Sequence, residues 1–207
     1  EDIWAKDSWM EIIQRFMHID EEEIQKDGVT VETEETMIFP RYHQLDCVRK
    51  LVASAKEHGS GEDYLIQHST GSGKSKSIAW LVHRLTSLHD DNDEAVFDGV
   101  VVVTDRTVLD KRLRNTIYEL DHKTGVVEAI TGEHGSKSEE LAEALAAGKP
   151  VIITTLQTFP YVIEHTQGLS ERDYAVVVDE AHSSQTGETA KELQEILSGK
   201  DVSEDDD

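Results

Sequence analysis

The first segment whose residue types could do chemistry is Ser69–Ser75, which combines glycines, hydroxyls and one lysine. Glycines let a backbone curl until several N–H groups face one anion, a lysine can reach the outer phosphates, and a following serine can bind Mg²⁺. The full motif has glycine where His68 stands, and many such loops accept another residue there. The alternative is a glycine-rich turn with an incidental lysine. The segment is Ser69-Thr70-Gly71-Ser72-Gly73-Lys74-Ser75.

The second segment is Asp179-Glu180-Ala181-His182, which follows the apolar run 174–178. A carboxylate at Asp179 could hold the water shell of Mg²⁺, and Glu180 could orient and deprotonate the attacking water. His182 could couple hydrolysis to movement. The alternatives are that Asp179 caps the next helix and that His182 is an ordinary histidine at a helix start. Together the two segments predict a Mg²⁺-dependent nucleoside triphosphatase.

The elements that must position these residues follow from the hydrophobic pattern. Short runs rich in Val and Ile alternate with helical stretches, which indicates an α/β fold with a parallel sheet covered by helices on both faces. Ligands of such sheets bind at the carboxyl edge. The predicted strands are 64–67, 99–104, 126–130, 151–155 and 174–178, and the stretches between them are 77–89, 106–120, 137–148 and a less regular 159–170.

The N-terminal part has a different pattern. Apolar residues from Trp4 to Asp20 recur at helical spacing and predict an amphipathic helix that packs onto the rest. An acidic stretch follows, with a turn at Asp27-Gly28 and one short strand near 29–31. A second helix with a stripe of Leu45, Val48, Leu51 and Val52 begins after Pro40 and stops at Gly59 and Gly61. We therefore predict a helical connector over 1–38, the ATP-binding domain over 39–198 and a solvated tail over 199–207.

Composition excludes several classes of protein. The formal net charge of −23 argues against nucleic-acid binding through bulk positive charge, so any such contact must be local. The lone Cys47 forms no internal disulfide, and no Cys/His spacing resembles a zinc site, which favours a reducing cytoplasm. No run approaches the roughly 18 apolar residues of a membrane helix, and residues 1–20 do not resemble a signal peptide. The acidic excess could also reflect a salt-loving source.

Five motifs occur in the order seen in superfamily-two helicases. Within that superfamily the chain most resembles the restriction subunit of type I restriction-modification enzymes, over about Phe39 to Leu197. The resemblance implies a RecA-like P-loop NTPase domain that uses ATP and Mg²⁺ to move double-stranded DNA, with methylation and specificity subunits as partners and no membrane. The motifs are Phe39–Gln44, Thr70–Ser75, Thr104–Arg106, Thr154–Phe159 and Asp179–His182.

The resemblance also implies roles for single residues. Gln44 would read the adenine edge, with Arg41 and Tyr42 shaping the base pocket, because an amide can donate and accept at once. A surface glutamine that opens a helix is the alternative. Lys74, Asp179 and Glu180 would be catalytic, and Ser75 and Asp179 would hold the metal. The residues that would bind the nucleotide are Arg41, Gln44, Thr70, Gly71, Ser72, Gly73, Lys74 and Ser75.

Contacts to DNA are expected at two strand ends. Thr104, Arg106, Thr154 and Thr155 would touch phosphates through hydroxyls, backbone N–H groups and one guanidinium. Threonine is also common at strand ends because of its β-propensity, which is the alternative.

The family's second RecA-like domain, with its arginine finger, and the family's nuclease domain have no counterpart in the sequence. We therefore expect a fragment of a larger protein that binds ATP but hydrolyses it poorly, since such an arginine contributes about 10³ to 10⁵ in rate. Two alternatives remain at this stage: another superfamily-two DNA or RNA helicase, and a non-catalytic nucleotide switch.

Overall fold

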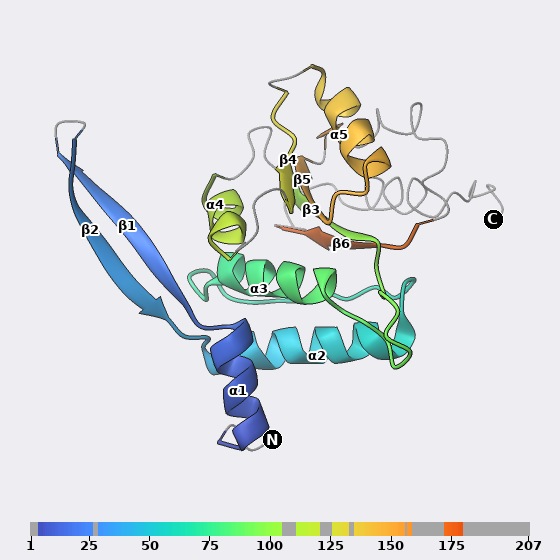
Figure 1. Ribbon diagram of the computed structural model, residues 1–207, viewed down its shortest axis with the longest axis horizontal. Coiled ribbons are helices and arrows are strands. Elements are labelled where there is room, and N and C mark those ends of the chain that lie inside the picture. The colour runs from blue at the N-terminus through green and yellow to red at the C-terminus, as the bar shows by residue number, and fades with distance from the viewer. Residues whose placement is uncertain are drawn as a thin grey trace.

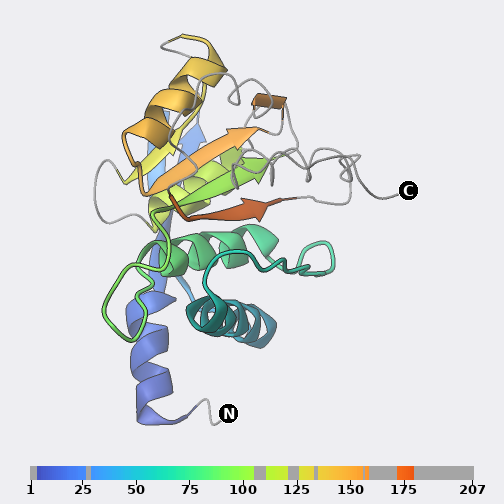
Figure 2. The same cartoon turned by 90° about the vertical axis from the view of Figure 1, so that its right-hand side faces the viewer.

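The computed structural model describes residues 4–26, 29–104, 111–120, 126–132, 135–155, 157–158 and 172–179, with the backbone alone for 21–26 and 29–32. Its centre is a parallel sheet of four strands in the order β4-β5-β3-β6. Figure 2 shows the strands side by side with their arrowheads on one side of the molecule. The strands are β3 (Gly99–Thr104), β4 (Val127–Ala129), β5 (Val151–Thr155) and β6 (Tyr174–Val178).

The sheet is covered on both faces because successive strand side chains point to opposite sides. Val100 and Val102 pack with helices α2 (Tyr42–His58), α3 (Lys74–Thr86) and α4 (Lys111–Glu119). Val101 and Val103 belong to a second cluster with helix α5 (Lys137–Ala146). All four valines are fully buried. The structure therefore confirms the predicted α/β fold class, a parallel sheet between helices.

Helix α3 forms the centre of the larger core. Trp80 is almost fully buried, and its indole N–H donates to the backbone oxygen of Phe16 at 2.9 Å. Helix α2 lies against α3 through the predicted stripe of Leu45, Val48 and Val52. Figure 1 shows α2 and α3 running side by side beneath the sheet. The two helices therefore hold the residues before and after the phosphate-loop motif in one packed unit.

The N-terminal part differs from the prediction. Helix α1 covers Lys6–Arg15 and ends before the predicted Asp20, and an antiparallel hairpin of two long strands replaces the single short strand. The strands are β1 (His18–Lys26) and β2 (Val29–Ile38), which Figure 1 shows extending away from the rest of the molecule. Polar residues can alternate with apolar ones in these strands because the hairpin is not covered by helices on both faces; residues 33–37 are all exposed. As predicted, α1 packs onto the core, through Ile12 and Phe16.

The predicted strand at 64–67 is wrong. The described backbone there joins no sheet, and Leu65 is 89% exposed. The Tyr64 hydroxyl instead lies 2.9 Å from the Ser54 hydroxyl on α2, so the segment is held beside that helix. A short apolar run becomes a strand only where a sheet edge receives it, and this run meets a helix. The phosphate-loop segment therefore follows an exposed stretch instead of the predicted strand.

Other expectations fall partly outside the described residues. The helix predicted over 106–120 is present as α4, from Lys111, and the stretch 159–170 lies outside the described part. The tail over 199–207 lies outside it too, and the proposed domain boundaries remain predictions. No helix in the described ranges combines the length and apolar character needed to span a bilayer.

Candidate nucleotide site

The phosphate-loop motif forms a tight turn that runs directly into helix α3. Gly71 and Gly73 have φ angles of +78° and +86°, which glycine adopts without the steric cost of a side chain. The Ser72 N–H donates to the Ser69 oxygen at 3.2 Å, and Gly73 is the residue before the first helical turn. The helix therefore begins at Lys74, where the partial positive charge of the helix dipole favours an anion.

The second motif begins at the same edge of the sheet. Asp179 directly follows β6, and its N–H donates to the Val103 oxygen at 2.9 Å, which extends the ladder between β6 and β3. Figure 2 shows that α3 starts on the side to which the strand arrowheads point. Lys74 and Asp179 are both half-buried at this edge. Glu180 and His182, the other two members of the motif, lie outside the described residues.

Residues 41–44 hold the loop by its carbonyl groups. The guanidinium of Arg41 donates to the Gly71 oxygen at 3.3 Å, and the amide of Gln44 donates to the Gly73 oxygen at 3.0 Å. Between them, Nε2 of His43 lies 3.1 Å from the Ser72 oxygen. The structure thus brings the predicted base-pocket residues Arg41 and Gln44 together with the phosphate loop. Three consecutive carbonyls are held by three side chains from one helix start.

Gln44 is not a surface residue, because its side chain is only 4% exposed. Its Oε1 accepts a hydrogen bond from the backbone N–H of Arg41 at 2.9 Å, which completes a capping box at the start of α2. The alternative of a solvent-exposed glutamine is therefore excluded. The adenine-reading role remains a prediction, and Tyr42 of the predicted base pocket is 69% exposed.

The loop has an unsatisfied polar atom that fits a phosphate ligand. Ser72 is 9% exposed, and its buried hydroxyl has no hydrogen-bond partner among the described residues. A buried hydroxyl without a partner is costly, and a phosphate oxygen would accept its proton. Thr70 in the same loop is exposed, and Ser75 in the first turn of α3 is half-buried. The hydroxyl chemistry of the loop therefore suits a phosphate with its cation.

The threonines predicted to touch DNA lie at the ends of β3 and β5. Thr104 and Thr155 are paired across the two strands, and Thr154 is fully buried. The Thr155 hydroxyl lies 2.9 Å from that of Thr158, whereas those of Thr104 and Thr154 have no partner within the described ranges. Arg106 lies outside those ranges. Their predicted role in DNA contact remains a prediction.

The sequence interpretation missed His43, although it stands between two predicted site residues. Its ring packs edge-to-face against the ring of His68, with centroids 5.2 Å apart and an interplanar angle of 89°. His68 is the residue that replaces the expected first glycine of the motif. The only signal in the sequence was the position of His43 in the first helical turn, next to Gln44.

Two ion-pair networks, also missed, attach the N-terminal part to α3. Lys76, in the first turn of that helix, donates to Asp20 of β1 at 2.8 Å. Partial burial and the Asp20 carboxylate raise the pKa of Glu119, at the end of α4. The side chains come from elements far apart in the sequence, so no local pattern could have indicated the contact.

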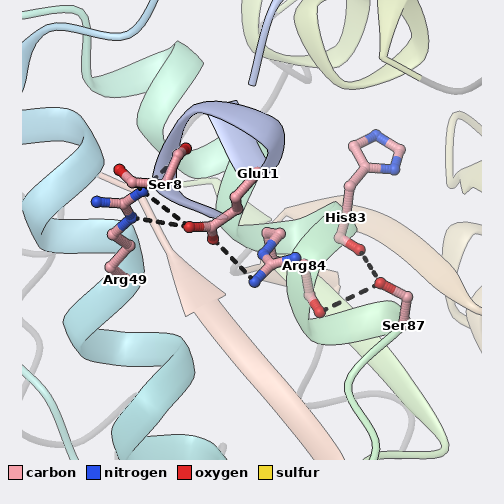
Figure 3. A network of polar contacts seen from close by, with 6 residues as sticks. All are labelled: Ser8, Glu11, Arg49, His83, Arg84 and Ser87. Carbon is pink, nitrogen blue, oxygen red and sulfur yellow. Dashed lines mark hydrogen bonds and ion pairs between the residues drawn. The ribbon is translucent and has the colours of Figure 1, made fainter. Parts of the chain in front are cut away.

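The second network is centred on Glu11 of α1. Figure 3 shows its carboxylate between Arg49 of α2 and Arg84 of α3, at 2.9 Å and 3.2 Å. Arg49 also donates to the Ser8 hydroxyl at 2.9 Å. Burial lowers the pKa of the Arg84 guanidinium, and the Glu11 carboxylate opposes that effect. Helix α1 is thereby linked to both helices that form the phosphate-loop site.

A parallel sheet between helices, with a glycine turn opening a helix at its carboxyl edge, defines the class of P-loop nucleotide-binding domains. The model of the SWI2/SNF2 ATPase family matches residues 43–202, most of the chain. The chain belongs to the SWI2/SNF2 ATPase family. A search of curated proteins and of solved structures found no match.

Membership in this family gives the fold and the general activity. The chain is a helicase-like ATPase domain of the superfamily-two type, with the RecA-like fold expected from the sequence. The family indicates an ATP-hydrolysing enzyme that uses ATP, typically with Mg²⁺.

Proposed function

We propose that this chain is the first motor domain of a type I restriction subunit, which couples Mg²⁺-ATP hydrolysis to translocation of double-stranded DNA. The observation that carries the proposal is the set of contacts by which side chains of residues 41–44 hold the carbonyl groups of Gly71–Gly73, within a chain of the SWI2/SNF2 ATPase family. The resemblance of residues 101–113 and 176–187 to the restriction subunit's versions of these motifs supports the narrower assignment.

The residues of the loop would hold the triphosphate. Lys74 would contact the outer phosphates, the backbone N–H groups at the start of α3 would donate to their oxygens, and the Ser72 hydroxyl would gain its missing partner. Ser75 and Asp179 would hold Mg²⁺, which when bound neutralises charge on the phosphates. The described ranges contain no group of three or more metal-binding His, Cys, Asp or Glu residues. Mg²⁺ needs none, since water and phosphate oxygens complete its shell.

Gln44 retains the capacity to read adenine while it holds the loop. A side-chain amide has two N–H donors and two acceptor lone pairs, and Gly73 and Arg41 use one of each. One donor and one acceptor are left, which is the pair that a bidentate contact with an adenine edge requires. Arg41 and Tyr42 would then lie beside the base. Gln44 would thus connect the base to the phosphate loop.

ATP hydrolysis and movement along DNA would depend on the segments that follow the strands at the carboxyl edge of the sheet. Glu180 would orient the attacking water and accept its proton, and His182 would transmit the state of the site. Thr104, Arg106, Thr154 and Thr155 would contact DNA phosphates. Because Thr154 is fully buried, its contact would have to use the backbone or follow a local rearrangement. Local contacts agree with the overall charge of −23, which repels DNA elsewhere.

The first experiment measures binding of Mg²⁺-ATP to Lys74→Ala and to the control Lys50→Ala. Lys50 is a lysine on α2 that is 76% exposed, so its loss should leave affinity unchanged. Lys74→Ala should weaken binding by more than about tenfold, because a charge-assisted contact to phosphate contributes about 1.5–3 kcal/mol. Equal affinities in the two variants would refute the nucleotide assignment.

The second experiment tests the narrower function in the assembly with methylation and specificity subunits. We propose that this assembly works in the cytoplasm. Duplex DNA carrying the recognition site should stimulate ATP hydrolysis, and Glu180→Gln should abolish that stimulation while ATP still binds. Stimulation by single-stranded RNA instead would favour another helicase, and no stimulation by any nucleic acid would favour a nucleotide switch.

A further inference from the structure

We propose that His43 is a positioning residue of the phosphate loop: it orients the Ser72–Gly73 peptide so that the Gly73 N–H faces the bound phosphate. This inference rests on the proposed nucleotide site and adds a residue to it. The observation behind it is the contact between Nε2 of His43 and the Ser72 oxygen, at 3.1 Å. Because a carbonyl oxygen only accepts, Nε2 must carry the hydrogen, in either the neutral or the charged ring.

Because of the geometry of the peptide bond, a contact that holds the Ser72 carbonyl also fixes the direction of the Gly73 N–H. In a trans peptide the C=O and the following N–H point in opposite directions. A Ser72 oxygen drawn toward α2 therefore directs the Gly73 N–H away from α2. No peptide in the described residues is cis, and the φ of +86° at Gly73 permits the required turn. The adjacent contacts of Arg41 and Gln44 act on the neighbouring peptides in the same way.

His68 also contacts the ring of His43. The two rings meet edge-to-face with centroids 5.2 Å apart, and both side chains are half-buried. Ring pairs in this arrangement are attracted through the positive edge of one ring and the negative face of the other. His68 stands at the beginning of the loop and Ser72 near its end, so His43 contacts both. The departure from glycine at position 68 thus gains a physical role, since glycine would offer no ring.

The test separates the donated hydrogen bond from the packing of the ring. His43→Phe keeps an aromatic ring against His68 but has no donor, whereas His43→Gln keeps a side-chain N–H at a similar reach. His58→Phe is the matched control, because His58 lies on the same helix and is exposed, and its Nδ1 contacts Ser54 one turn earlier in α2. Dissociation constants for Mg²⁺-ATP, Mg²⁺-ADP and adenosine are measured, with thermal unfolding as a check of folding.

His43→Phe should weaken ATP and ADP binding by roughly three- to tenfold, the range of one net hydrogen bond, and leave adenosine binding unchanged. His43→Gln should restore most of the affinity, and His58→Phe should behave as the wild type. An unchanged ATP affinity in His43→Phe would overturn the inference, and so would an equal loss for adenosine, which would indicate a base-pocket or general structural role.

The two proposals fail in distinguishable ways. If Lys74→Ala binds ATP normally, the nucleotide site itself is wrong. If Lys74→Ala loses ATP while His43→Phe retains it, the site stands and only the role of His43 is refuted.

Discussion

The amide nitrogen of Gln44 lies 3.0 Å from the carbonyl oxygen of Gly73, so close that a Cβ on Gly73 would be 2.6 Å from the same nitrogen. Gln44 cannot move aside cheaply, because it is buried and its amide is bonded at both ends. Position 73 therefore requires glycine for its left-handed backbone and also for space. This relationship joins the start of α2 to the start of α3 at the predicted phosphate site.

Gly73→Ala should lower both nucleotide affinity and stability. A left-handed backbone costs a residue with a side chain about 1–2 kcal/mol, and displacement of Gln44 adds the loss of a buried hydrogen bond, about 1–3 kcal/mol. Gly71→Ala is the matched control, because its φ of +78° carries the same backbone cost while an added Cβ meets nothing within 4 Å. Thermal unfolding and ATP titration should both rank Gly73→Ala below Gly71→Ala. Equal losses would show that Gln44 does not restrict the loop.

Glu11→Ala should destabilise the attachment of α1 to the core. The change leaves Arg49 and Arg84, only 17% and 22% exposed, without their shared carboxylate, and we expect a loss of about 1–3 kcal/mol in the free energy of unfolding. Chemical denaturation measures it. A double-mutant cycle with Arg84→Met isolates the coupling. A coupling near zero would mean that the network contributes only through packing.

Thr154→Val should raise stability. The Thr154 hydroxyl is fully buried with no partner in the described part of the chain, and valine has nearly the same shape, so about 0.5–2 kcal/mol should be gained. Thr155→Val is the control, because it removes a hydroxyl bonded to Thr158 and should destabilise. A loss of duplex-stimulated ATP hydrolysis in Thr154→Val despite unchanged folding would show that DNA uses this hydroxyl. Destabilisation equal to that of Thr155→Val would contradict the prediction.

Glu119 should make stability depend on pH in the weakly acidic range. Partial burial of its carboxyl, and then the nearby Asp20, raise its pKa in the folded state. The folded state therefore holds this proton more tightly than the unfolded state. The resulting contribution to the free energy of unfolding is complete below the ordinary glutamate pKa and is lost as pH rises through the pKa of the folded state. Glu119→Gln should remove that loss. Because the carboxyl is only partly buried and the residue as a whole is exposed to solvent, the change in the free energy of unfolding should be under about 1 kcal/mol.

The measurement for Glu119 is the free energy of unfolding between about pH 4 and pH 7, with the exposed Glu57→Gln as the control. The difference between Glu119→Gln and the wild type should grow with pH, whereas the control should show no such trend. A difference that shrinks as pH rises would give the opposite sign and contradict the raised pKa.

Local patterns in the sequence were sufficient for much of this molecule. Continuous apolar runs predicted β3 and β5, because strands buried on both faces have no polar side. A similar run predicted β6, although that strand is only partly buried. Glycines at 71 and 73 predicted the turn before α3, because their backbone angles are excluded for most other residues. Gln44, Lys74 and Asp179 could be selected because each stands at a helix start or strand end. These features depend on residues that are close together in the chain.

Tertiary structure decided the rest. The run 64–67 has the composition of a strand, yet it lies beside α2, because strand formation depends on a partner elsewhere in the chain. The long hairpin likewise depends on pairing of β1 with β2, which the acidic composition concealed. His43 on the Ser72 carbonyl, Lys76 with Asp20, and Glu11 between two arginines all join distant segments. The sequence determined which residues could bind a nucleotide, whereas packing of α1, α2 and α3 decided which side chains hold them in place, because such contacts exist only after the chain has folded.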